Sequence, residues 1–361
     1  MNHQFISLCK RKVLHWAFLL LGSILVTESF TIATPTAAQS VQVSKHNFQG
    51  VRFYRTTIDL ADVNTYLAIG LANYATQANS AAASRGDESF GRLVRRQRAA
   101  VVANGTFFSL DAQRRVMGNV ISGGRFLKYS PWENYGTTLG IRPDKRLEML
   151  TTRVDGKPAW GEYWFSLTAG PRLLRKGRIW LAPKLEGFKD PRVLGVASRA
   201  AIGFPAGGRK LILVTFLSNV SLRQEAQIMS AIGCSEALNL DGGSSLGLAK
   251  SGKIIVSPTR ELTNVIAVYD RSHPAPIALR ESWLRFSQQA RILGPRYRVL
   301  VKVVNAQDQT RIRSLFPEAF HSSYEGRSVI QVGSFRDRAK ADTVLRLMGN
   351  KGFSAIIDAS R

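Results

Sequence analysis

Short apolar strands separated by polar loops are the main pattern of residues 47–270. Two of these strands end alike, each running directly into a polar residue and then glycine. The first covers residues 99–103 and leads into Asn104 and Gly105, and the second covers residues 237–240 and leads into Asp241, Gly242 and Gly243. Glycine after a buried strand lets backbone N–H groups approach a ligand where a Cβ atom would clash. We therefore expect the two strand ends to form two halves of one site.

A helix is indicated between the strand at 210–217 and the strand that leads to Asp241. Ser221 and Gln224 have the spacing of a capping box, and Gly233 stands where the helix would stop. The order strand, helix, strand predicts a βαβ-like crossover. Such a crossover would deliver Asp241 to a carboxyl strand edge, where ligand sites are common.

Residues 297–361 have a different pattern, in which strands and helices follow the order βαββαβ. That order is the ferredoxin-like arrangement, which has a core of its own. A proline-containing connector with a helical patch, residues 274–296, precedes it and predicts a linker between two domains. The expected fold class is α+β, with a mixed-sheet domain at 39–273 followed by this small ferredoxin-like module.

The first 38 residues have the pattern of a secretory signal peptide. Basic residues at 10–12 precede an apolar run at 13–26, and small residues around Ala38 offer a cleavage site. The run is shorter than the roughly 20 residues that span a membrane, although an uncleaved anchor is the alternative. The sequence thus predicts an exported protein, periplasmic or extracellular, and we also expect association with the cell wall.

The chain is strongly basic, with 50 Lys and Arg against 25 Asp and Glu and a formal net charge of +25. Removing residues 1–38 takes away three basic residues and one acidic residue, so the excess stays with the exported part. Such a charge favours anionic partners. Export argues against nucleic acid as that partner, and the basic residues are scattered along the chain.

Several classes of hydrolase are excluded by the residue inventory after position 38. The histidines there are His46, His273 and His321, none of them near either glycine motif, and the one cysteine is Cys234. A Ser-His-Asp or Cys-His mechanism would lack its base, and a zinc site would lack clustered ligands. Carboxylate, amide and arginine chemistry remains.

Three segments supply that chemistry: the amide of Asn104, the guanidinium of Arg199 before an apolar strand, and the carboxylate of Asp241. An arginine fork can hold a phosphate through two parallel hydrogen bonds. Each segment alone is more typical of a turn or a surface charge. Their combination in one chain is what points to a site.

The successive segments NGTFF, TAGPRLLRKGRIW, SRAAIGF, LNLDGGSS and TRELTNVIAVYD resemble, in order, the motifs of the phosphodiester glycosidase family. The resemblance covers residues 47–270 and implies that the mixed-sheet domain is catalytic. By resemblance, Asn104, Arg199 and Asp241 are the catalytic positions. The substrate-binding positions expected beside them are Gly105, Thr106, Gly242, Gly243, Ser244, Ser245 and Asn264. Thr106 and Ala200 depart from the family's usual Gly and Thr.

The activity that the resemblance implies is hydrolysis of a sugar-1-phosphodiester of the GlcNAc-1-phosphodiester type, or of a related envelope polysaccharide or exopolysaccharide. The leaving phosphate monoester has a second pKa of about 6, so it needs little proton donation. It does need a cation, for which Arg199 is the candidate. Asp241 would attack the sugar or activate water, Asn104 would hold substrate, and Glu133 and Glu261 are candidate second carboxylates.

Two questions stay open at this level. No cofactor is certain, but a divalent cation near Asp241 is chemically reasonable because carboxylate and hydroxyl oxygens suit hard cations. The departures at Thr106 and Ala200 also leave a second function open, that of a non-catalytic glycan-binding protein of the cell envelope.

The C-terminal module has its own resemblance. The strand with VIQVGSF, residues 329–335, and the helix at 338–350 are similar to the sporulation-related repeat, or SPOR-like, domain. That resemblance implies binding of peptidoglycan, the cell-wall glycan. A generic ferredoxin-like docking domain is the alternative.

Overall fold

The computed structural model describes residues 39–79, 86–111, 113–130, 132–293, 296–324 and 327–360. The predicted signal peptide at 1–38 lies outside these residues. No helix in the described part of the chain is both long enough and apolar enough to cross a membrane.

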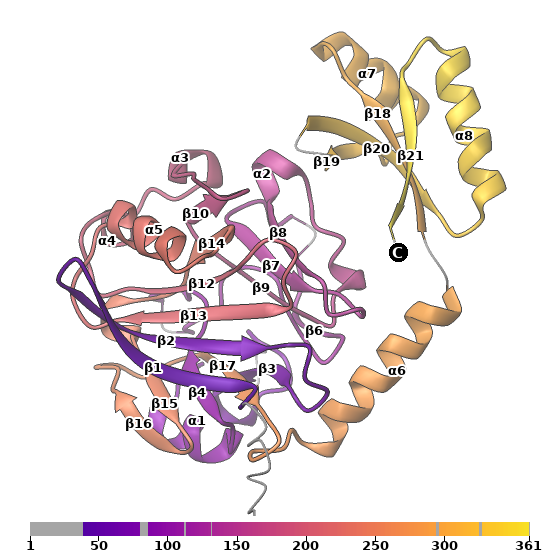
Figure 1. Ribbon diagram of the computed structural model, residues 1–361. Helices are drawn as coiled ribbons and strands as arrows, with labels where there is room; N and C mark the ends of the chain where they lie inside the picture. The colour runs from indigo at the N-terminus through magenta and orange to yellow at the C-terminus, as the bar shows by residue number, and fades with distance from the viewer. Residues whose placement is uncertain are drawn as a thin grey trace, which may run out of the picture. The chain divides into compact units, whose positions relative to one another are not determined.

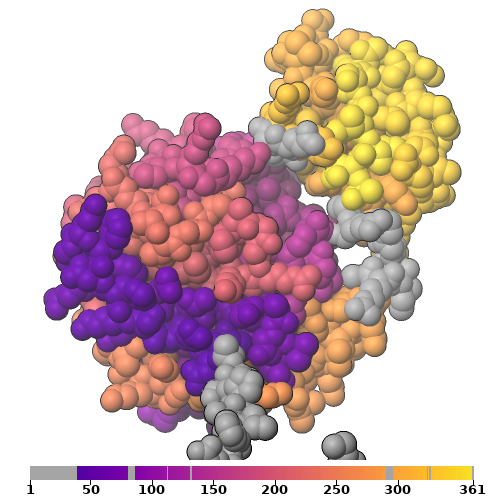
Figure 2. All heavy atoms as spheres, in the orientation of Figure 1, coloured from indigo at the N-terminus to yellow at the C-terminus, as the bar shows by residue number. Residues whose placement is uncertain are grey.

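A seven-stranded sheet with antiparallel pairing carries both the N-terminal hairpin and the strand that leads to Asp241 (Figure 1). Its strands in spatial order are β1 (Val41–Phe48), β2 (Val51–Asp59), β13 (Lys210–Phe216), β12 (Ala200–Phe204), β14 (Glu236–Asn239), β10 (Arg172–Arg175) and β11 (Arg178–Ile179). The β1–β2 hairpin forms one edge, and Figure 2 shows it in indigo on the surface.

Two five-stranded antiparallel sheets complete this part of the described chain. The β4 sheet has the order β16 (Lys253–Val256), β15 (Leu248–Lys250), β4 (Val101–Asn104), β17 (Asn264–Tyr269) and β3 (Tyr66–Leu71). The β9 sheet has the order β6 (Arg125–Lys128), β5 (Val120–Ser122), β9 (Phe165–Ala169), β7 (Thr137–Ile141) and β8 (Leu147–Thr151).

The three sheets share one hydrophobic core. Ile202 of β12, Ile266 of β17 and Leu167 of β9 are fully buried in the same cluster. Side chains alternate between the two faces of a strand. Thus Ile202 faces the shared core, whereas its neighbour Ala201 belongs to the cluster on the opposite face of the sheet.

Helix α5 (Leu222–Ala231) covers that opposite face. The Ser221 hydroxyl accepts from the Gln224 N–H at 3.2 Å, and the Gln224 side chain accepts from the Ser221 N–H at 3.0 Å, so the predicted capping box is confirmed. Both β13 and β14 pair antiparallel with β12, which lies between them. They therefore run in the same direction, and α5 crosses over one intervening strand.

Other helices cover the remaining faces or form short turns. Helix α1 (Phe90–Gln97) buries Phe90 and Leu93 against the β4 sheet. The predicted linker contains α6 (Ile277–Leu293), whose Trp283 packs edge-on against Trp164 with 4.8 Å between the ring centroids. The short helices are α2 (Thr152–Asp155), α3 (Pro183–Glu186) and α4 (Pro191–Leu194).

The C-terminal residues form a ferredoxin-like module with its own core. Its elements are β18 (Arg296–Lys302), α7 (Ala306–Leu315), β19 (Phe320–Tyr324), β20 (Arg327–Phe335), α8 (Arg338–Asn350) and β21 (Ala355–Ser360). The spatial order β19-β20-β18-β21 is antiparallel throughout. Val301, Ile330 and Met348 are buried in its separate cluster. The predicted α+β class, including the βαββαβ order, is confirmed. The expected mixed sheet is not: the strands paired in the described part of the larger domain are antiparallel, because α5 crosses over β12 and leaves β13 and β14 unpaired with each other.

Candidate active site

The ends of β4 and β14, which belong to different sheets, are joined by the side chain of Asn104. Its amide nitrogen donates to the main-chain carbonyl of Asp241 at 2.6 Å, and its amide oxygen accepts from the N–H of Gly247 at 3.2 Å. Asn104 is buried. Its amide therefore holds the backbone of Asp241 in place.

A second asparagine fixes the loop that follows β4. The Asn264 amide oxygen accepts from the Thr106 N–H at 2.8 Å, and its amide nitrogen donates to the Thr106 carbonyl at 3.0 Å. A Cβ atom on Gly105 would lie 1.9 Å from that amide oxygen, so only glycine fits there. The Thr106 hydroxyl donates to the Thr168 carbonyl. These contacts fix the backbone of the loop that follows β4.

Asp241 is 8% exposed and lies just past the end of β14. One oxygen accepts from the Gly242 N–H at 3.0 Å, and the other accepts from Arg260 at 3.1 Å. A Cβ atom on Gly242 would lie 2.4 Å from the Ser198 carbonyl oxygen, so the chain must be glycine here. Burial raises the pKa of Asp241, and contacts with Ser245 and Arg260 oppose that rise.

Arg260 is the functional candidate that sequence reasoning missed. Its Nη2 contacts Asp241, its Nε donates to the Ser245 hydroxyl at 2.6 Å, and its guanidinium lies 4.4 Å from the centre of the Phe108 ring. The side chain is 31% exposed. Within the described residues, its hydrogen bonds use two of the five N–H donors of an arginine, so three are left without a partner there. In the sequence, Arg260 is identifiable only as the arginine of the TRELTNV motif, directly before the candidate carboxylate Glu261.

Arg199 is placed differently from the sequence expectation. Only 3% of it is exposed, and the guanidinium donates to the carbonyls of Val220, Val193 and Gly195 and to the Asn239 amide oxygen. Four of its five donors are therefore engaged inside the protein. Arg199 is expected to hold the loop that follows α4 rather than a departing phosphate.

Beneath Arg199 lies Glu225 of α5. Its carboxylate is fully buried, lies 3.7 Å from the Arg199 Nε, and accepts no hydrogen bond from the described residues. Burial raises the pKa of Glu225 to about 8, although the positive charge of Arg199 opposes that rise. Burial also lowers the pKa of Arg199. Arg199 and Glu225 thus pack together behind the segment at 190–198 that lines the cleft.

These residues surround a cleft with a volume of about 390 Å³. Of the predicted positions, Arg199, Asp241, Gly242, Gly243 and Ser244 line it, and Arg260 joins them. Asn104, Gly105, Thr106, Ser245 and Asn264 lie behind its walls. The other lining residues come from 107–110, 190–198 and 239–240.

The two candidate second carboxylates point elsewhere. Glu133 pairs with Lys128 at 3.2 Å, and Glu261 lies 3.9 Å from Arg92 of α1. Neither lines the cleft. Tyr135 is a half-buried residue whose hydroxyl is buried, and burial together with the charges of Glu133 and Asp241 raises the pKa of that hydroxyl. That hydroxyl has no hydrogen-bond partner among the described residues.

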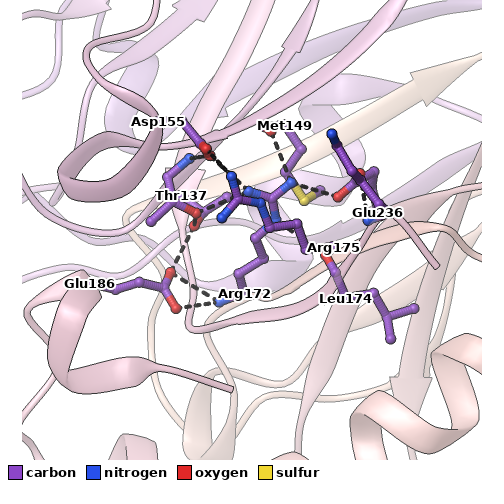
Figure 3. A network of polar contacts seen from close by, with 10 residues as sticks. Thr137, Met149, Asp155, Arg172, Leu174, Arg175, Glu186 and Glu236 are labelled. Carbon is purple, nitrogen blue, oxygen red and sulfur yellow. Dashed lines mark hydrogen bonds and ion pairs between the residues drawn. The ribbon is translucent and has the colours of Figure 1, made fainter. Parts of the chain in front are cut away.

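Arg172, in the TAGPR motif, anchors a buried network rather than a ligand (Figure 3). Its guanidinium contacts Asp155 at 3.0 Å and Glu236 at 2.6 Å, and its N–H donates to Glu186 at 2.8 Å. Burial raises the pKa of Glu186 to about 7. The network ties the seven-stranded sheet to the β9 sheet, because Glu186 also accepts from Thr137 of β7 at 2.7 Å.

The described residues include no cluster of acidic side chains of the kind that would bind the predicted divalent cation. No group of three or more His, Cys, Asp or Glu side chains in the described part of the chain could together hold a metal ion. The cation stays a prediction.

The model of the phosphodiester glycosidase family matches residues 97–269, which include every residue that forms the cleft. This part of the chain belongs to that family. The match includes both strand ends and the TRELTNV segment with Arg260. No curated protein matches the sequence.

Solved structures show the same fold at low sequence identity. A hypothetical protein from Synechocystis has a TM-score of 0.50 and 22% identity, over 64% of this chain and 62% of that one. The catalytic domain of zebrafish N-acetylglucosamine-1-phosphodiester alpha-N-acetylglucosaminidase, auto-inhibited by its pro-peptide, has a TM-score of 0.50 and 19% identity, over 66% of this chain and 85% of that one. The chain thus spans less than two thirds of the Synechocystis protein.

The two departures from the family pattern lie away from the cleft surface. The Thr106 hydroxyl is bonded to the main chain, and Ala200 is buried in the shared core. Neither residue lines the cleft. The changes therefore remove no side chain from the surface that a substrate would touch.

Proposed function

We propose that the chain is an exported hydrolase that cleaves the glycosidic bond of a sugar-1-phosphodiester, of the GlcNAc-1-phosphodiester type or in a related envelope polysaccharide or exopolysaccharide. The family supports a phosphodiester glycosidase-type activity. The observation that carries the proposal is the pairing of a buried carboxylate with an arginine that still has free donors, Asp241 and Arg260, on one cleft.

The reaction needs few groups. Water supplies a hydroxyl to C1 of the sugar, the C1–O bond breaks, and the phosphate monoester leaves with the bonding electron pair. The water proton passes through Asp241 to solvent. Because a phosphate monoester has a second pKa of about 6, it leaves at neutral pH without a strong acid. A cation that meets the growing negative charge is the larger need, and Arg260 supplies it.

Asp241 serves either as the nucleophile or as the base that activates water, and both roles require the ionised carboxylate. Since burial raises its pKa, ionisation is completed at a higher pH than for an ordinary aspartate. The rate should therefore rise with pH through that raised pKa. Arg260 limits the rise by stabilising the charge.

The test is sugar release from methyl GlcNAc-1-phosphodiester and from UDP-GlcNAc by the purified protein. Asp241→Asn should reduce kcat/KM by about a thousandfold or more. Asp144→Asn is the matched control, because Asp144 lies in the exposed turn between β7 and β8, where its carboxylate contacts Arg146 at 2.8 Å. Full activity of Asp241→Asn, or no release by the wild type from any sugar-1-phosphodiester, would refute the proposal.

The C-terminal module is proposed to attach the enzyme to cell-wall glycan, on the basis of its SPOR-like sequence. Its ferredoxin-like fold supports an independent role, because it has a separate core. The full chain should co-sediment with purified peptidoglycan, whereas the chain ending at residue 296 should stay in solution. Equal sedimentation of both would assign the binding to the rest of the protein.

A further inference from the structure

The cleft is lined by aliphatic as well as charged side chains. Asp241 and Arg260 are among the charged ones. Leu110, from the loop after β4, and Val196, from the segment after α4, line the same cleft and are 51% and 68% exposed. Val193 of α4 lies among the lining residues as well.

Exposed aliphatic side chains occur singly on most proteins, but two from separate segments on one cleft mark a binding surface. These side chains offer no hydrogen bonds. The hydroxyl groups of a sugar gain no hydrogen bond from these side chains, whereas an alkyl chain needs none. Aliphatic surface instead fits an aliphatic ligand.

Aromatic stacking does not offer a competing explanation. Phe108, an aromatic ring of the lining, is 8% exposed and is covered by the guanidinium of Arg260. Phe107, the other aromatic lining residue, is half-buried and packs against Phe188 with 6.0 Å between the ring centroids. A nucleobase would need an open ring face on which to stack. The exposed lining residues Leu110 and Val196 provide no such face.

We propose that the substrate is a sugar-1-phosphate esterified to an aliphatic alcohol, with the phosphate at Arg260 and the alkyl chain over Leu110, Val193 and Val196. This inference rests on the proposed function and names the aglycone of that reaction. The bond that breaks is unchanged, so the alkyl chain contributes only binding energy.

The experiment compares methyl, butyl and octyl esters of GlcNAc-1-phosphate, each below its micelle concentration. The three alkyl phosphates are nearly equal as leaving groups, so their ratio of kcat/KM reports contact with the chain. Each buried methylene is worth about fourfold in affinity at full burial. We expect kcat/KM to be at least about tenfold higher for octyl than for methyl, which is well below that ceiling.

The double variant Leu110→Asn/Val196→Asn should lower the octyl-to-methyl ratio toward one. Val63→Asn/Leu185→Asn is the matched control, since these residues are 76% and 59% exposed and lie outside the cleft. Its ratio should equal that of the wild type. A ratio near one in the wild type, or a preference for UDP-GlcNAc over the octyl ester, would overturn the inference while leaving the proposed function intact. No hydrolysis of any ester would instead refute the proposed function.

Discussion

Arg199 and Arg260 line the same cleft, yet their guanidinium groups have different surroundings. Arg199 donates to three main-chain carbonyls and one side-chain amide, and its charge faces the buried Glu225. Arg260 contacts one carboxylate and one hydroxyl and rests on an aromatic ring. An arginine that lines a cleft can therefore still be unable to bind a ligand. Its ability to bind depends on how many of its N–H donors are not already bonded within the protein.

Arg172 extends the comparison, because it is as buried as Arg199 and is also satisfied by internal acceptors (Figure 3). Both buried arginines join elements that are far apart in the chain. Their removal should therefore change stability before chemistry, whereas removal of Arg260 should change chemistry before stability.

The largest effect is expected for Arg199→Ala. The substitution leaves the buried carbonyls of Val193, Gly195 and Val220 without their donor, so the free energy of unfolding should fall by about 3–5 kcal/mol. Urea denaturation measures this. Arg199→Lys keeps the charge but not the fork, and it should recover only part of the loss. A stable Arg199→Ala protein that fails to bind substrate would reverse the comparison.

Arg260→Ala should give the next largest effect, and on a different quantity. Loss of the cation that meets the leaving phosphate should reduce kcat/KM for a sugar-1-phosphodiester by about 100- to 1000-fold. The free energy of unfolding should fall by no more than about 1 kcal/mol, because the Arg260 side chain is partly exposed and Asp241 keeps the hydrogen bond from the Gly242 N–H. Steady-state kinetics and urea denaturation of one preparation separate the two. Arg260→Lys should restore part of the activity.

Glu225→Gln should change the pH dependence of the free energy of unfolding. Glu225 has a pKa of about 8 in the folded protein against an ordinary value of 4.5. Between these values the folded protein binds a proton that the unfolded chain has released, so the free energy of unfolding falls as pH rises. The variant cannot titrate there. The wild type should lose about 3–4 kcal/mol relative to the variant from pH 5 to pH 8.

Thermal or urea unfolding at several pH values measures this difference. Glu186, whose pKa is raised to about 7, titrates in both proteins and cancels from the comparison. Arg199 is the one charged group that acts on Glu225 in the described structure. Parallel pH profiles for the two proteins would mean that Glu225 is ionised in the folded state.

Arg192→Ala should have the smallest effect. Arg192 also lines the cleft, but it is exposed and pairs with Asp190 two residues away. Such surface ion pairs contribute little to the free energy of folding, so the urea midpoint should not change. A large loss of stability here would show that exposure is a poor guide to an arginine's role in this protein.

The sequence was sufficient for those parts of the fold that depend on local patterns. The strand ends at Asn104 and Asp241, the capped helix after Ser221 and the βαββαβ order of the C-terminal module follow from alternation, capping and turn residues. It could not predict that three sheets share one core, because that arrangement depends on pairing between distant strands.

Within the candidate site, sequence identified the segments more reliably than the role of each side chain. Asp241 lines the cleft, but Asn104 and Asn264 bond to backbone, and Arg199 donates to three carbonyls from two separate segments. Nothing in a motif states how many donors of an arginine remain free. For the same reason Arg260 was missed, since its value comes from Phe108 and Ser245 beside it.

The long-range hydrogen bonds of Asn104 and Asn264 also determine how much of the chain must be synthesised before the site can form. Asn104 reaches a partner 137 residues away, and Asn264 closes the loop of a residue 158 positions before it. A nascent polypeptide that ends before Asn264 can form β4, yet it has nothing to close the loop behind Asp241. Contacts of such long sequence separation form late in folding. Premature termination in this region should therefore give an inactive product rather than a weakened enzyme.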